Sequence, residues 1–79
     1  MVTIVGEGAN AEVFLNENEY KAFEIMSLGR DLNLPPRDLL KSFKEEGLNS
    51  KEMRAGTNAY NLRKQGANIF KGSYGGMWF

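Results

Sequence analysis

The sequence predicts a small α+β domain in which a β-hairpin is followed by three helices and a second β-hairpin. Short β-branched and aromatic runs stand near both ends of the chain, as is typical of strands. Between them, three segments repeat apolar residues at helical spacing and begin with recognisable helix-start signals. The length of 79 residues allows one domain, residues 1–79, with a small core.

The first expected element is a β-hairpin at the N-terminus. Residues 2–5 are β-branched and apolar, and residues 12–15 resume an extended run. The intervening residues, 6–10, contain the glycines and asparagine of a turn. Two such runs around a turn predict a hairpin.

A helix is expected over residues 17–30. Asn16 can cap its N-terminus, and Glu19 can reach back to the Asn16 backbone amide, which is the capping-box arrangement. Leu15 and Tyr20 stand where the two residues of a hydrophobic staple stand. Gly29 and the residues 31–33 are expected to end this helix.

A second helix is expected over residues 36–46, with a proline at its start and a glycine after its end. Pro36 suits a first helical turn because its fixed φ is already helical. Asp38 lies in that first turn, near the positive end of the helix dipole. Gly47 is expected to stop the helix.

A third helix is expected from Ser50 to about Gln65, since Asn49 and Glu52 repeat the capping-box pattern. Gly56 lowers the helical stability of its middle by about 1 kcal/mol relative to alanine. Two interpretations therefore stay open: one continuous helix, or a break at Gly56 after which Thr57 caps a shorter helix.

The last expected element is a second hairpin. Residues 67–71 and 77–79 are short apolar runs on either side of the glycine-rich residues 72–76. The C-terminal aromatics Trp78 and Phe79 fit core or dimer packing better than base stacking.

Three short helices followed by a hairpin describe a winged helix-turn-helix. Residues 15–23 resemble the strand-to-helix start of OmpR/PhoB-type response-regulator DNA-binding domains, and residues 35–40 resemble the start of their middle helix. Residues 62–75 resemble the end of that family's recognition helix and its wing. The resemblance departs at Asn16, where threonine is usual, in the single N-terminal hairpin, and in the lack of a receiver domain. It implies a winged-helix fold and DNA binding, without phospho-signalling.

The charges are balanced overall and uneven along the chain. Ten Lys and Arg residues face ten Asp and Glu residues. Residues 1–52 hold six bases and ten acids, a net charge of −4, and residues 53–79 hold four bases and no acid, a net charge of +4. A basic C-terminal third suggests an anionic partner there.

The third helix is the candidate DNA-reading element. Its polar side chains fall opposite Ala55, Ala59 and Leu62 at 100° per residue. Arginine and asparagine can read bases, and threonine and lysine suit base or phosphate contacts. The predicted DNA-binding residues are Arg54, Thr57, Asn61, Lys64, Gln65, Lys71, Ser73 and Tyr74. The last three would act from the wing, although an ordinary tight turn there is an equal alternative.

The expected function is sequence-specific binding of double-stranded DNA by a small cytoplasmic transcription regulator, acting as a homodimer because one short module binds weakly. The alternative is a protein-interaction module that docks a basic partner on Glu17, Glu19 and Glu24 of the first helix. The chain has neither cysteine nor histidine, so we expect no enzyme activity, metal or cofactor. No apolar run approaches the ~18 residues of a membrane span.

Overall fold

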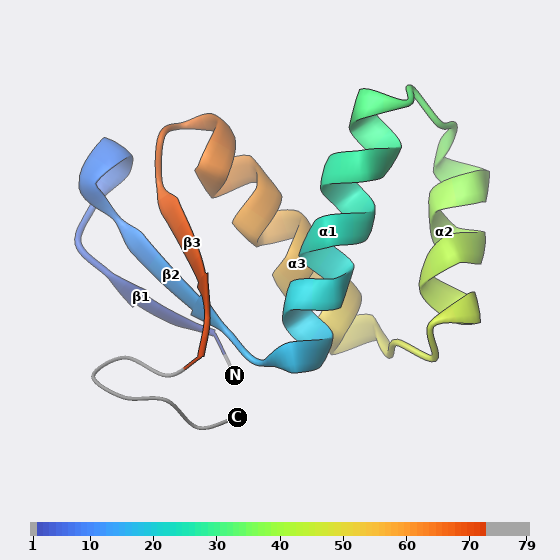
Figure 1. Cartoon of the computed structure of the whole chain (residues 1–79), viewed down its shortest axis with the longest axis horizontal. Helices are drawn as coiled ribbons and strands as arrows, with labels where there is room; N and C mark the ends of the chain where they lie inside the picture. The colour runs from blue at the N-terminus through green and yellow to red at the C-terminus, as the bar shows by residue number, and fades with distance from the viewer. Residues whose placement is uncertain (1, 73–79) are drawn as a thin grey trace.

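A computed structural model describes residues 2–72, and the elements within that range follow the predicted order. They are β1 (Thr3–Val5), a 3₁₀ turn (Gly8–Asn10), β2 (Glu12–Leu15), α1 (Glu17–Asp31), α2 (Pro36–Glu45), α3 (Ser50–Lys64) and β3 (Asn68–Lys71). Figure 1 shows the sheet at one end of the molecule and α2 at the other, with α1 and α3 between them. The prediction of a small α+β domain with an N-terminal hairpin and three helices is confirmed.

The sheet has the strand order β1-β2-β3, so β2 is central. β1 pairs with β2 antiparallel, with Ile4 opposite Val13. β3 pairs with β2 in parallel, with Ile69 beside Val13 and Phe70 beside Phe14. A parallel pair requires a long crossover connection, and here all three helices form it. The described residues thus join β3 to the N-terminal hairpin, and the predicted partner of β3, residues 77–79, lies outside them.

Two helices begin at the capping boxes that the sequence predicts. The Asn16 side chain accepts a hydrogen bond from the Glu19 amide at 2.8 Å, and the Glu19 carboxylate accepts one from the Asn16 amide at 2.9 Å. Asn49 and Glu52 make the same two bonds at the start of α3. These bonds satisfy amides that a helix start leaves without intrahelical partners.

Helix α3 is continuous through Gly56, so the interpretation with a break and a cap at Thr57 is wrong. The reason is tertiary: a β-carbon at position 56 would lie 2.5 Å from the Ala22 carbonyl carbon and 2.6 Å from the Phe23 amide nitrogen. Real β-carbons essentially never come so close to backbone atoms. Glycine is therefore at this position because the backbones of α1 and α3 approach closely there.

The expectation that Gly29 helps to end α1 is wrong. Gly29 is buried within the helix, which continues to Asp31. A β-carbon at Gly29 would collide with the Leu39 side chain of α2, so this glycine makes room for the next helix. The chain leaves α1 through Asn33, whose φ of 57° is left-handed.

The core consists of two apolar clusters that lie on either side of the α1–α3 pair. One joins the sheet to the two helices and contains Ala11, Val13, Leu15, Phe23, Ala59 and Ala67. The other joins α2 to them and contains Ala22, Met26, Leu39, Phe43 and Leu48. Tyr60 packs against both clusters. Within the part of the chain that the structure describes, no helix is long and apolar enough to cross a membrane.

The close approach at Gly56 leads to a stability prediction. Alanine normally stabilises a helix interior by about 1 kcal/mol relative to glycine. We expect Gly56→Ala instead to lower the free energy of unfolding by about 1–3 kcal/mol, because the added methyl group overpacks the α1–α3 contact. Urea unfolding followed by circular dichroism measures the change.

The control is Asn58→Ala, two residues along the same helix at an exposed position. It should leave stability unchanged or slightly raised, since alanine is the better helix former. A Gly56→Ala variant as stable as the original chain would contradict the close approach.

Candidate nucleic-acid interface

Helices α2 and α3 are joined by a four-residue turn, residues 46–49. Gly47 within it has a φ of 73°, and Leu48 is buried against the α2 cluster. A helix-turn-helix likewise joins its two helices by a short turn that often contains glycine. The turn leaves one side of α3 packed on α1 and the opposite side exposed.

Four polar side chains follow one line along the exposed side of α3. Arg54, Asn58, Asn61 and Gln65 are all exposed and recur at helical spacing, so they lie on one line along the helix. Lys51 and Lys64 are also exposed and stand on either side of this line. We call these six residues the α3 stripe. At 1.5 Å per residue, α3 is about 22 Å long, which spans much of one turn of B-form DNA.

Glu52 is the only acidic residue of α3, and it forms no ion pair with the cations of the α3 stripe within residues 2–72. Glu52 uses one carboxylate oxygen to accept the Asn49 amide and the other to accept the Asn18 side-chain amide, both at 2.9 Å. Glu52 therefore caps α3 and ties it to the start of α1. Within residues 2–72, Arg54 and Lys64 make no ion pair with any carboxylate.

The predicted site residues divide into those that the fold brings together and those that it does not. Arg54, Asn61, Lys64 and Gln65 lie on the exposed side of α3 as predicted. Thr57 is half-buried, and its hydroxyl donates to the Met53 backbone oxygen at 2.9 Å, which occupies its proton. Lys64 lies 5.4 Å above the Tyr60 ring.

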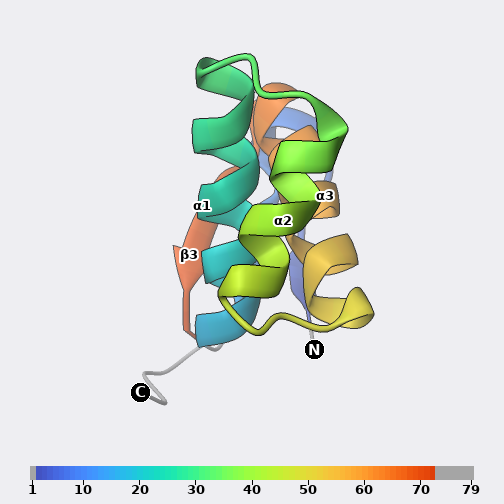
Figure 2. The ribbon, with the colours of Figure 1, turned by 90° about the vertical axis from the view of Figure 1, so that its right-hand side faces the viewer.

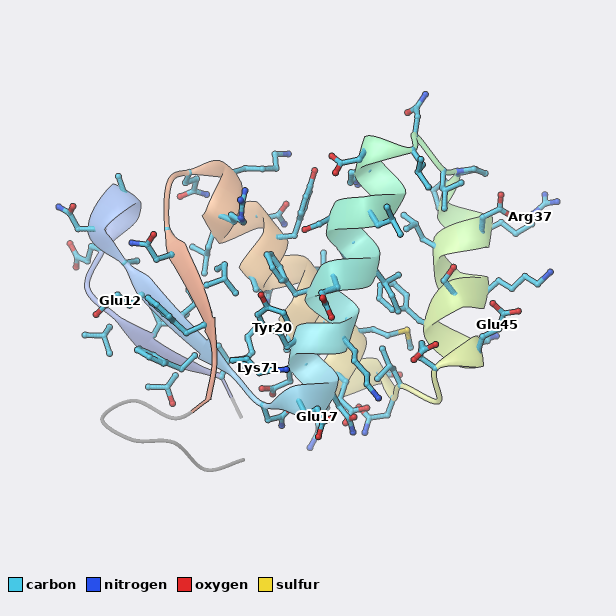
Figure 3. The ribbon with its side chains drawn as sticks, viewed as in Figure 1. Glu12, Glu17, Tyr20, Arg37, Glu45 and Lys71 are labelled. Carbon is cyan, nitrogen blue, oxygen red and sulfur yellow. The ribbon has the colours of Figure 1, made fainter. Side chains whose placement is uncertain are left out.

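The wing residues do not extend this surface within the described chain. The Lys71 ammonium lies 5.8 Å from the centre of the Tyr20 ring, and Figure 3 shows the two side chains together at the start of α1. The structure thus brings Lys71 to α1 rather than to the α3 stripe. Ser73 and Tyr74 lie outside the described residues.

Two residues of the α3 stripe, Lys51 and Asn58, were missed by the sequence analysis. Both line a shallow hollow together with Arg54, Val2, Glu19 and Ala55. The signal was available, because position 58 follows Arg54 by four residues and position 51 precedes it by three, so both are its neighbours on the helix surface.

The acidic residues proposed for a protein partner are also divided by the fold. Glu17 and Glu24 are exposed on α1. Glu19 is only 6% exposed, and its carboxylate is bonded to the Asn16 amide. Glu19 therefore offers little surface to a docking partner, and its carboxylate caps α1.

No family model, curated protein or solved structure matches this chain.

The exposure of the α3 stripe leads to a prediction about stability. Arg54→Ala and Asn61→Ala should each change the free energy of unfolding by no more than about 0.5 kcal/mol, because neither side chain is packed. Urea unfolding checks this. A loss of more than about 1 kcal/mol would assign these side chains a structural role and remove them from the candidate interface.

Proposed function

We propose that the chain binds double-stranded DNA with α3 in the major groove. The observation that carries the proposal is the α3 stripe: polar and cationic side chains exposed along one helix that follows a short glycine-containing turn. An α-helix fits the major groove, and the second helix of a helix-turn-helix lies there in proteins that read DNA.

The side-chain chemistry of the α3 stripe suits both parts of DNA recognition. Arginine pairs with guanine, and asparagine or glutamine with adenine, so Arg54, Asn58, Asn61 and Gln65 can contact base edges. Lys51 and Lys64 stand beside this line of base-reading side chains, where they can contact phosphates.

The finer proposal is a winged helix-turn-helix that regulates transcription as a homodimer. The order hairpin, three helices and β3 supports it, as does the resemblance of residues 62–75 to an OmpR/PhoB-type recognition helix and wing. In this proposal β3 would be the first strand of the wing, and Ser73 and Tyr74 would contact the DNA backbone, whereas Lys71 lies over the Tyr20 ring of α1. Two copies would double the number of contacts that one small module makes.

A DNA-binding titration tests the proposal. We expect a mixed-sequence duplex to bind the chain with an affinity that falls steeply with salt, with a slope of log K against log salt of about −3 if three cations replace counterions. Arg54→Glu with Lys64→Glu should reduce affinity by about tenfold or more, because it reverses two of those charges. Fluorescence anisotropy of a labelled duplex measures both effects.

The matched control is Lys41→Glu with Lys44→Glu, which changes the net charge by the same amount on the exposed side of α2. It should retain most of the affinity. Absence of binding at low salt would overturn the proposal. Equal losses in the two double variants would show a response to net charge alone and would remove α3 as the DNA-reading element.

A further inference from the structure

Helix α1 has apolar side chains on two faces, and the structure covers one of them. Its inner face packs into both core clusters. On another face, Leu28 is 60% exposed and Leu32 is 61% exposed, and Ile25 is half-buried. These three residues are spaced i, i+3 and i+7, so they form one contiguous line, which we call the α1 stripe. A lone exposed leucine is ordinary, whereas a contiguous apolar line marks an interaction surface.

The α1 stripe continues from a groove between α1 and α2. The groove is lined by Lys21, Glu24, Ile25, Ser42, Glu45 and Glu46. Ile25 belongs to both the groove and the stripe. Figure 2 shows α1 and α2 side by side, and the two helices run antiparallel, because a short connection, residues 32–35, joins them.

Carboxylates border the α1 stripe on both sides. Glu17, Glu24 and Asp31 are exposed and repeat every seven residues, so they form a row along one side of it. Glu45 and Glu46, both exposed, stand across the groove at the end of α2. Lys21 is the one cation among the groove-lining residues. None of these five carboxylates makes an ion pair within residues 2–72.

We propose that the α1 stripe and its acidic borders form a docking groove for a basic amphipathic helix of another protein. The apolar face of that helix packs on Ile25, Leu28 and Leu32. Its flanking lysines and arginines pair with the carboxylates on either side. Apolar anchors at helical spacing on a groove are the features by which proteins bind an amphipathic helix.

Charge decides between this occupant and a second copy of the chain. A symmetric dimer through the α1 stripe would place the same surface opposite itself. The acidic rows of the two copies would then face one another, and such like-charge juxtaposition opposes association. A basic helix meets no such opposition. The residues that line the groove include none of the α3 stripe, so docking in the groove does not depend on DNA binding.

The test uses two synthetic helical peptides of about 18 residues, long enough to form a helix. Both carry leucines at the same helical spacing, and the polar positions are all lysine in one and all glutamate in the other. Titration of the ¹⁵N-labelled chain, followed by NMR, should show binding of the lysine peptide with shifts along Ile25–Leu32 and near Glu45. The glutamate peptide should bind at least about tenfold more weakly.

Matched variants separate specific docking from general attraction to an acidic protein. Leu28→Gln with Leu32→Gln should weaken binding of the lysine peptide by about tenfold or more, since it removes the apolar anchors. Leu40→Gln, at an exposed leucine of α2 that does not line the groove, should leave it unchanged. Glu45→Lys with Glu46→Lys should weaken binding and flatten its salt dependence.

Several results would overturn the proposal. These are no binding of the lysine peptide, equal binding of the glutamate peptide, or an equal loss in Leu40→Gln. A further contradicting result could come from sedimentation of the chain without peptide. If the chain is a dimer, and the double variant Leu28→Gln with Leu32→Gln is a monomer, the occupant of the groove is a second copy. All the substituted positions are exposed, so each variant should fold as the original chain does. Urea unfolding of each variant checks this.

Discussion

The backbones of α1 and α3 come into contact where Ala22 faces Gly56. A β-carbon at position 56 would lie 2.5 Å from the Ala22 β-carbon, so the two helices can pack this closely only because one residue is glycine and the other alanine. The two apolar clusters lie on either side of this contact, and Tyr60 packs against both. A wider spacing of α1 and α3 would separate the sheet cluster from the α2 cluster. In a chain this short, each cluster alone would bury too little apolar surface for independent stability.

The same contact determines which side of α3 faces solvent. Ala55, Gly56 and Ala59 are buried against α1 and the sheet, so the opposite side, with Arg54 and Asn61, must be exposed. The hydrogen bonds of Glu52 to Asn49 and Asn18 hold the first turn of α3 beside the first turn of α1. Packing and capping together orient the α3 stripe, and they leave its cations without a carboxylate partner among the described residues.

The uneven charge along the chain becomes an uneven charge in space. The acid-rich first part forms α1 and α2, and the exposed carboxylates Glu17, Glu24 and Asp31 follow one side of α1. The acid-free part after Glu52 forms most of α3 and β3. Helix α3 packs behind α1 (Figure 1), and the residues that line the groove between α1 and α2 include none of the α3 stripe. One small domain can therefore offer a cationic surface and an acidic groove that do not compete.

Much of the candidate site could be predicted from the sequence because the side chains of one helix have known relative positions. Arg54, Asn61, Lys64 and Gln65 are exposed as their spacing predicts. The prediction was less accurate for side chains that form local hydrogen bonds within the fold. The Glu19 carboxylate accepts the Asn16 amide, and the Thr57 hydroxyl donates to the Met53 backbone oxygen. Lys71 was assigned to the candidate site without knowledge of the strand that β3 pairs with, and register brings it to Tyr20 instead.

The sequence by itself determined the N-terminal hairpin and where the three helices begin, because the signals for them act within a few residues. Asn16 with Glu19 and Asn49 with Glu52 start α1 and α3 at the predicted residues. Only the tertiary structure decided the parallel pairing of β3 with β2, the continuity of α3 through Gly56, and the exposure of Leu28 and Leu32. Each of these depends on which distant residue is the neighbour, for example Ala22 opposite position 56. Local spacing carries no information about such neighbours, since packing between elements selects them.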